Sequence, residues 1–343
     1  MNSKDHYWQM PAAYLRVFLH HAADRQLPLG PLLQGTELQA GRLRDSEHPV
    51  SFGDTRQVLR NVTRMLGPGW HLALGPRLTL PSHGPLGFAV ATAADFRAAV
   101  DVLLRFIGIR APFLTLTGTV DEQRFVIRFF ETTGMGEERQ AMIELALLSV
   151  QTLLERPLGR ELHGASLALA YPPPPYRERL ESAFHARLAF DAKGHSLSFP
   201  VAWLEEPCLM NDPAMHRYLL NRCDEEIREL QGAQPAELTV RQALMSKPGQ
   251  LPRLSEIAAT QNVSARTLIR RLKRENTGYQ AILEEVRRKL AVDYLRYSDM
   301  SIAQIAYRLG YQDPSNFGRA FRGWFSQSPG RYRDTATQGP LTR

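Results

Sequence analysis

The feature that most constrains the fold is the stretch of residues 301–325, SIAQIAYRLGYQDPSNFGRAFRGWF. Its first half repeats apolar residues at the spacings that line one helical face: Ile302, Ile305, Ala306 and Leu309. The repeat stops at Gly310, and a second apolar face follows Asp313 and Pro314: Phe317, Ala320, Phe321 and Trp324. This pattern predicts a short helix, a sharp turn and a second short helix.

The same arrangement occurs a second time in residues 254–275, LSEIAATQNVSARTLIRRLKRE. A turn follows each first helix at Asn262 or Gly310, the two residue types that most readily take a left-handed backbone. Ser264 or Asp313 then supplies the N-cap of the second helix. The inward-facing residues of the second helices are four positions apart: Leu268 with Leu272, and Phe317 with Phe321. We therefore expect two helix-turn-helix units.

The inward pairs leave mostly basic and polar residues on the outer faces of the second helices: Arg266, Ile269, Arg270, Lys273, Ser315, Asn316, Arg319 and Arg322. An arginine on the exposed N-terminal half of such a helix can donate paired hydrogen bonds to guanine in the major groove. Arg270 and Arg319 occupy equivalent positions. Basic groups farther along and the capped helix starts suit phosphate contacts: Ser264, Lys273, Arg274, Asp313 and Arg322.

Residues 279–297, YQAILEEVRRKLAVDYLRY, lie between the two units and predict one long amphipathic helix. Its buried stripe consists of Ile282, Val286 and Leu290. At ~1.5 Å per residue this helix spans about 28 Å, close to the ~34 Å of one duplex turn. Two recognition helices joined by this rod could enter successive major-groove segments, so a monomer would read an asymmetric site.

The charge of the chain is concentrated in its last third. Residues 233–343 hold 18 Lys and Arg against 9 Asp and Glu, whereas residues 1–232 are close to neutral. A basic region behind a near-neutral body favours a polyanion as partner, with a solvated basic surface as the alternative. Together with the capped helical pairs, this balance predicts binding to double-stranded DNA.

The sequence favours the cytoplasm and indicates no membrane partner. It has no run of about 18 apolar residues, and its start, MNSKDHYWQM, does not resemble a secretory signal. Cys208 and Cys223 are the only cysteines, which suits a reducing compartment. No metal-ligand or phosphate-cradling motif occurs, so we expect no metal and no cofactor. Ser82-His83 lacks the surroundings of a catalytic pair, and we expect no enzyme.

The N-terminal two thirds predict a mixed domain of helices and strands. Helices are expected at 93–108, 137–155 and 212–231, and strands at 112–119 and 123–131. Residues 67–90 alternate Gly and Pro with apolar runs, where a ligand pocket could form. Trp70, His71, Arg77 and Phe88 are candidate pocket residues as a group, and none of them is individually predicted as a ligand site. The small, polar stretch QGAQPAEL at 231–238 marks a boundary. The expected architecture is α+β, with an effector-sensing domain at 1–232 and an all-helical DNA-binding domain at 233–343.

The region 235–335 resembles the DNA-binding domain of the AraC/XylS family of bacterial transcription regulators. Its most specific match is MSIAQIAYRLGYQDPSNFGRAFRGWFSQSPGRYR. The resemblance implies that six residues read bases: Arg266, Ile269, Arg270, Ser315, Asn316 and Arg319. Two positions depart from the family pattern. Asn262 stands where Gly is usual, and Ile269 stands where many members have a polar reader, so contact there would be apolar, for instance with a thymine methyl.

Residues 1–232 resemble the arabinose-binding-like sensor domain of one branch of this family. The matching stretches are LGPRLTLPSHGPLGFAVATAADFRAAVDVLLRF and LSFPVAWLEEPC. The resemblance implies a small-molecule effector of unknown identity, and the label does not make arabinose the ligand. It also implies a homodimer as a further partner, and RNA polymerase if the protein is an activator.

Three other functions compete with an effector-controlled regulator of a bacterial operon. The first is a regulator without an effector, controlled by oligomerisation or expression level. The second is an enzyme whose basic helical tail only localises it, although no catalytic set is visible. The third is an architectural protein that binds DNA without regard to sequence.

Overall fold

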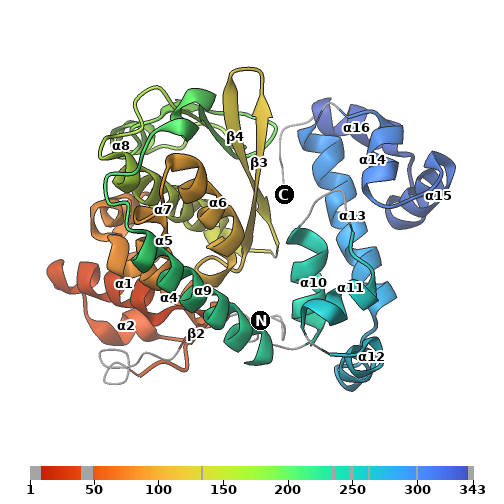
Figure 1. Cartoon of the computed structure of the whole chain (residues 1–343), viewed down its shortest axis with the longest axis horizontal. Coiled ribbons are helices and arrows are strands. Elements are labelled where there is room, and N and C mark those ends of the chain that lie inside the picture. Colours follow the sequence, from red (N-terminus) through yellow and green to blue (C-terminus); the bar gives the residue numbers. More distant parts are fainter. Residues whose placement is uncertain are drawn as a thin grey trace. The chain divides into compact units, whose positions relative to one another are not determined.

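The computed structural model describes residues 9–39, 49–132, 134–233, 236–246, 251–261, 263–298 and 300–338. The chain forms two compact units (Figure 1). The first comprises Met1–Asp191 and His195–Leu230, and the second comprises Gln231–Arg343 with the short segment Ala192–Gly194. The first unit combines helices with a sheet, and the described part of the second consists of helices. The predicted α+β class is therefore confirmed.

A five-stranded sheet in the order β3-β4-β7-β5-β6 lies in the first unit. Its strands are β3 (Leu114–Asp121), β4 (Arg124–Glu131), β5 (Ser166–Ala168), β6 (Arg187–Ala189) and β7 (Ser196–Pro200). Only β5 and β6 pair in parallel. Phe125, Ile127 and Phe129 of β4 are buried at every second position. Because this alternation places one face on the core, the strands expected at 112–119 and 123–131 are confirmed.

The 20-residue helix α7 (Arg139–Leu158) lies at the centre of the first unit. It contacts α5 (Gly84–Ala91), α6 (Phe96–Phe106) and a 3-10 helix at Trp70–Arg77. The helices expected at 137–155, 93–108 and 212–231 correspond to α7, α6 and α9 and are confirmed. Helix α9 spans Pro213–Ala233. The other α helices of this unit are α1 (Ala12–Asp24), α2 (Leu29–Leu33), α4 (Phe52–Leu66) and α8 (Arg177–Ala183). Strands β1 (Gln9–Met10) and β2 (Val50–Ser51) form a separate two-stranded ladder, and short 3-10 helices occur at Leu80–His83, Ile107–Ile109, Gly136–Glu138 and Val201–Glu205.

The sequence analysis named no helix between residues 67 and 90, where glycine and proline interrupt the apolar runs. The structure instead forms 3-10 helices at Trp70–Arg77 and Leu80–His83, followed by α5. Most of α5 is buried, including Leu86, Ala89 and Val90, each 0% exposed. A helix that is apolar all round has no polar face, so its sequence shows no helical period.

The helices of the second unit include the two predicted pairs and the predicted long helix between them. They are α10 (Ala236–Ser246), α11 (Leu254–Thr260), α12 (Ala265–Arg274), α13 (Tyr279–Tyr297), α14 (Ile302–Arg308), α15 (Pro314–Phe325) and α16 (Pro329–Gln338). They share one core, to which α13 contributes Ile282, Val286 and Leu290 as predicted. The long helix therefore shares one core with both helical pairs.

Both cysteines, Cys208 and Cys223, are buried free thiols. Burial raises the pKa of each to about 11, so both keep their protons at neutral pH. Among the described residues, no helix has the length and hydropathy needed to cross a bilayer.

Candidate nucleic-acid interface

The first helical pair, α11 and α12, is closed by a turn and a cap. The N–H of Val263 donates to the carbonyl of Ala258 at 3.1 Å, which ends α11. Ser264 Oγ accepts from the N–H of Thr267 at 3.1 Å and caps α12 as predicted. Asn262, the expected left-handed residue, lies outside the described residues.

The second pair, α14 and α15, repeats these contacts. Gly310 has φ +73°, which confirms the predicted left-handed turn. The N–H of Tyr311 donates to the carbonyl of Ala306 at 3.0 Å, 48 positions after the corresponding bond in the first pair. The Asp313 carboxylate accepts from the N–H of Ser315 at 2.7 Å and caps α15. The inward pairs lie 49 positions apart, so the second turn is longer by one residue.

Both inward pairs are buried as predicted. Leu268 and Leu272 of α12 are at most 1% exposed, and Phe317 and Phe321 of α15 are 0% exposed. Since the inner face of each second helix is fixed in this core, its opposite face must point to solvent.

Polar contacts from α13 fix the second pair, α14 and α15. Arg287 donates to the carbonyls of Leu309 and Gly310 at 2.8 and 3.2 Å, and so binds the C-terminal end of α14. Its guanidinium lies 4.6 Å from the centre of the Tyr311 ring. Glu284 accepts from Trp324 Nε1 of α15 at 2.9 Å. The sequence analysis did not identify these residues, because a helical pattern does not say which polar group reaches a neighbouring turn.

Glu275, just after α12, ties the first pair to α10. Its two carboxylate oxygens accept from the backbone N–H groups of Ala236 and Glu237 at 2.7 and 2.8 Å. Arg241 of α10 in turn pairs with Glu285 of α13 at 2.6 Å. Because carboxylates stabilise helix N-termini, these contacts orient α10 and α12 together.

All eleven residues expected at the DNA surface are exposed; they are Ser264, Arg266, Ile269, Arg270, Lys273, Arg274, Asp313, Ser315, Asn316, Arg319 and Arg322. Ile269 is 42% exposed, so its side chain is accessible for the apolar base contact that the sequence predicts. Arg319 donates to Asn316 Oδ1 at 2.6 Å, so these two expected readers lie side by side.

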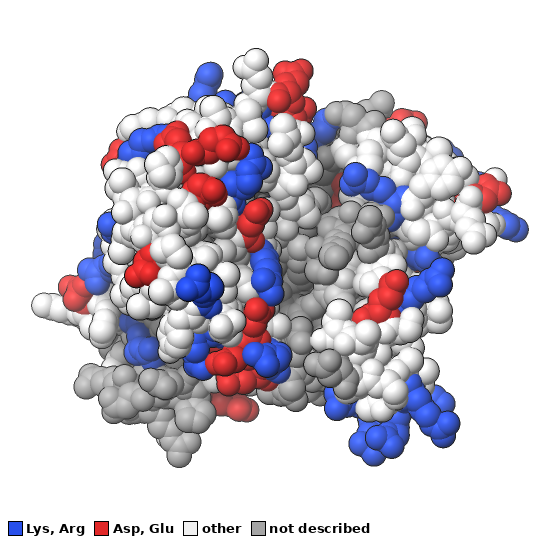
Figure 2. Space-filling view, viewed as in Figure 1, with Lys and Arg blue, Asp and Glu red and all other residues white. Residues whose placement is uncertain are grey.

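The basic side chains of α12 gather on one end of the second unit (Figure 2). The helix has five cations and no acid among its residues: Arg266, Arg270, Arg271, Lys273 and Arg274. Among the residues that the structure describes, no ion pair engages Arg270, Lys273 or Arg319. An unneutralised basic surface of this kind attracts a polyanion.

Asp313 differs chemically from the other expected phosphate contacts. Its bond from the Ser315 N–H lowers the pKa of its carboxyl, so it carries a negative charge at neutral pH. A carboxylate repels phosphate. Any phosphate contact at this helix start would therefore use backbone N–H groups, and the expected role of Asp313 stays a prediction.

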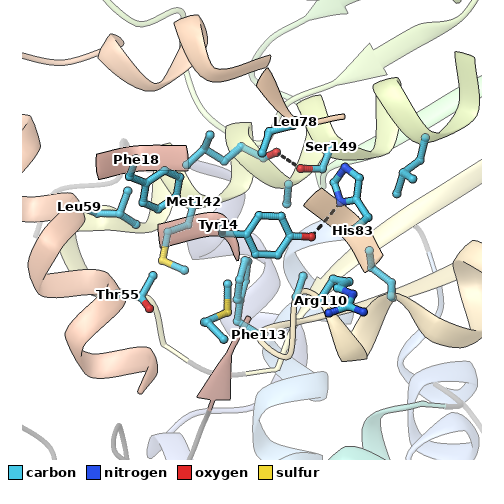
Figure 3. Close-up of a pocket in the computed structure, with 16 residues that line it drawn as sticks. Tyr14, Phe18, Thr55, Leu59, Leu78, His83, Arg110, Phe113, Met142 and Ser149 are labelled. Atoms are coloured by element: carbon cyan, nitrogen blue, oxygen red, sulfur yellow. Dashed lines mark hydrogen bonds between the residues drawn. The ribbon is translucent and has the colours of Figure 1, made fainter. Parts of the chain in front are cut away.

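The first unit contains an internal cavity, and none of the four candidate pocket residues, Trp70, His71, Arg77 and Phe88, lines it. Trp70 and His71 are buried, Arg77 pairs with Asp24 at 2.6 Å, and Phe88 is 38% exposed. The cavity has a mainly apolar lining (Figure 3). The hydroxyl groups of Thr55 and Ser149 also line it, and both donate to backbone carbonyls of their own helices or caps. Three further polar groups come from Tyr14, His83 and Arg110. No sequence signal joins these three positions, since each comes from a different segment.

The adjacent residues His20 and His21 lie on different faces of α1. His20 is exposed and His21 is 1% exposed. No group of three or more His, Cys, Asp or Glu residues that could hold a metal ion occurs within the described parts of the chain.

Fold and surface together define a protein with a helix-turn-helix DNA-binding unit and a separate mixed α and β unit. Comparison with protein families agrees. The arabinose-binding domain of AraC transcription regulators, N-terminal, matches residues 27–208, and a helix-turn-helix domain matches residues 257–335. The first match alone covers more than half of the chain. The chain belongs to the AraC family of transcription regulators, as its sequence predicted.

Three named regulators are among the similar proteins, and two of them match over most of both chains. The ornithine utilization regulator of Pseudomonas aeruginosa is 29% identical over 326 residues, which cover 95% of this chain and 96% of that protein. The regulator VirS of Mycobacterium tuberculosis is 26% identical, covering 88% and 90%. The transcriptional activator NphR of Rhodococcus is 40% identical over 80 residues, covering 23% of this chain and 24% of that one.

Proposed function

We propose that this DNA-binding regulator reads a specific promoter sequence with two recognition helices, α12 and α15. The observation that carries the proposal is the exposure of Arg270 and Arg319 at equivalent positions of two capped helices that share one core. Direct readout would come from Arg266, Ile269, Arg270, Ser315, Asn316 and Arg319. Phosphate contacts from Ser264, Lys273, Arg274 and Arg322, and from backbone N–H groups at the helix start that Asp313 caps, would set the register.

Arginine truncation tests base readout. Arg270→Ala and Arg319→Ala are each expected to cost about 1–3 kcal/mol at the cognate site and little on random DNA, because a lost guanine contact removes discrimination. Binding is measured by fluorescence anisotropy on both DNAs, after footprinting has located the site. Arg187→Ala, which removes an exposed arginine from the first unit, serves as the control and should change neither affinity. Equal weakening on all DNA would support the architectural alternative instead.

Lys273→Ala is the contrasting substitution, because a phosphate contact carries no sequence information. It is expected to weaken binding on both DNAs and to lower the slope of log affinity against log salt by about one. A loss confined to the cognate site would move Lys273 from the phosphate set to the base-reading set.

We further propose that a small metabolite bound in the first unit controls DNA binding. An effector that prefers one arrangement of the two units shifts the population competent for DNA. The match of the first unit to a ligand-binding family domain supports this proposal. A footprint and transcription response unaffected by any metabolite would favour the regulator without an effector.

We propose that the protein acts on the promoter of a bacterial operon. Its location would then be the cytoplasm, since bacterial DNA lies there. Activation would add RNA polymerase as a partner, and a homodimer would double the number of recognition helices. Transcription assays with purified polymerase, and sedimentation of the free protein, test these two partners separately. Turnover by the first unit alone would support the enzyme alternative.

A further inference from the structure

The internal cavity of the first unit lies between α1, α4 and α7. Its volume is about 50 Å³. This is roughly a third of the ~150 Å³ of an engineered apolar cavity that holds benzene. Most of the lining is aliphatic or aromatic, with Phe18, Leu59, Phe113, Met142 and Leu153 as examples. The space therefore suits a small apolar group.

One end of this cavity is polar. Tyr14 Oη lies 2.8 Å from Nδ1 of His83, and both side chains are buried (Figure 3). Burial, reinforced by the charge of Arg110, lowers the pKa of His83 to about 4, so its ring is neutral at pH 7. Its second nitrogen, Nε2, and Nε of Arg110 have no hydrogen-bond partner among the described residues.

Arg110 is the charged group of this polar end. Its side chain is 11% exposed, and its Nη2 pairs with Glu226 of α9 at 2.7 Å. The Nε–H beside that pair is left without an acceptor. A buried donor without an acceptor costs free energy, and a guanidinium is matched best by a carboxylate that can take two N–H groups. No Asp or Glu occurs among the residues described as lining the cavity.

We infer that the cavity binds a small apolar monocarboxylate, whose carboxylate group displaces Glu226 from Arg110. The hydrocarbon part occupies the space between α1, α4 and α7, and the Tyr14–His83 pair supplies further hydrogen-bonding groups. The inference rests on the proposed function, since it gives the effector a chemical class.

Displacement of Glu226 has a structural consequence. Glu226 lies in α9, which is the last helix before α10 of the DNA-binding unit. A ligand that removes the Arg110–Glu226 pair weakens one attachment of α9 to the first unit. This change can reach the DNA-binding unit through the continuous chain.

The relative named for ornithine utilization suggests a competing ligand. Ornithine carries two ammonium groups, and the described lining has no carboxylate to receive them. We therefore expect ornithine to bind this cavity no better than an alkylamine does.

The test uses the full-length protein and straight-chain monocarboxylates from acetate to octanoate, with the matching alcohols, alkylamines and ornithine. Isothermal titration calorimetry measures each affinity. The carboxylates should bind more than tenfold tighter than the alcohols and amines. Affinity should rise about fourfold per added CH₂ until the space is filled, which corresponds to ~0.8 kcal/mol each. No carboxylate binding, or equal binding of alcohols, would overturn the inference.

Two variants test the exchange at Arg110. Arg110→Leu should abolish carboxylate binding, whereas Glu226→Gln should tighten it at least threefold, because the competing carboxylate is gone. The matched control is Arg105→Leu. It removes the exposed pair of Arg105 with Asp224 of α9 but leaves the cavity intact, so affinity should not change. Weaker binding by Glu226→Gln would contradict the inference even if Arg110→Leu fails to fold.

Promoter affinity measured on the same samples separates this inference from the proposed function. Carboxylate binding that leaves DNA affinity and transcription unchanged would support the carboxylate site but contradict the proposal that a bound metabolite controls DNA binding. If another molecule controls DNA binding and no carboxylate binds, the carboxylate site is contradicted and the proposal of an effector is supported.

Discussion

At the scale of single residues, Glu144 is a fully buried acidic side chain of the first unit that depends on hydrogen-bond donors around it. It is 0% exposed and accepts hydrogen bonds from Tyr171 Oη at 2.7 Å and from Gln140 at 3.0 Å. Nε2 of His71 lies 2.5 Å from it. Burial, followed by the charge of Glu144, raises the pKa of Tyr171, so this tyrosine stays a donor. A buried carboxylate is tolerated only with such partners.

Replacing Glu144 by leucine tests this network. Glu144→Leu keeps the approximate volume but leaves His71 and Tyr171 without their acceptor, so the free energy of unfolding should fall by about 3 kcal/mol. Urea denaturation measures the loss. Glu178→Leu, at an exposed position of α8, is the control and should change stability by less than about 0.5 kcal/mol.

His195 makes the stability of the first unit depend on pH. Its Nδ1 accepts from the N–H of Ala170 at 3.3 Å, and burial, followed by the charge of Arg139, lowers its pKa to about 4. Between pH 6.5 and pH 4 the unfolded chain therefore binds a proton that the folded chain does not. Stability is lost as pH falls through this window.

His195→Asn should weaken this pH dependence while keeping an acceptor for Ala170. Between pH 7 and pH 5 the variant should lose roughly 2 kcal/mol less unfolding free energy than the wild type does. Urea titrations at the two pH values give the difference. Identical losses in the two proteins would show that His195 is protonated in the folded state as readily as in the unfolded chain.

At the scale of elements, the turn between α14 and α15 shows how one residue type sets local geometry. Gly310 has φ +73°, and a Cβ added there would lie 3.2 Å from Nη2 of Arg287. The sequence predicted this turn because only a few residue types accept a left-handed backbone. It did not predict the contact with α13, because Arg287 lies 23 positions upstream.

Gly310→Ala should lower the stability of the second unit by about 1–2 kcal/mol, since alanine is strained at positive φ. Gly323→Ala is the matched control within α15, where an added Cβ meets nothing within 4 Å. It should raise stability by roughly 0.5–1 kcal/mol, because alanine is the better helix former. Thermal unfolding measures both. The same sign for both variants would contradict this account of the turn.

At the scale of the whole molecule, charge and architecture divide the chain in the same way. The helical unit carries most of the excess Lys and Arg, while the first unit is close to neutral and holds the buried polar network and the internal cavity. DNA affinity should therefore be set in the second unit, and the first unit should affect it only through its own conformation.

Inserting five base pairs between the two major-groove segments of the cognate site tests whether α13 acts as a rigid rod. The insertion turns one segment to the opposite face of the duplex, so affinity should fall at least tenfold. On the altered site Arg319→Ala should cost nothing further, although it still weakens binding to the native site. Anisotropy titrations give all four affinities. Unchanged affinity on the altered site would mean that the two recognition helices, α12 and α15, bind DNA independently of each other.

The sequence by itself determined the helical pairs, their turns and caps, and the outward faces of α12 and α15. These features depend on short-range periodicity and on local backbone preferences, which are written within a few residues. Only the tertiary structure decided that α5 is a buried helix, that Glu144 meets His71, and that Arg110 joins Tyr14 and His83 at a cavity. Those outcomes depend on long-range packing, where partners dozens of positions apart are chosen by shape, burial and charge.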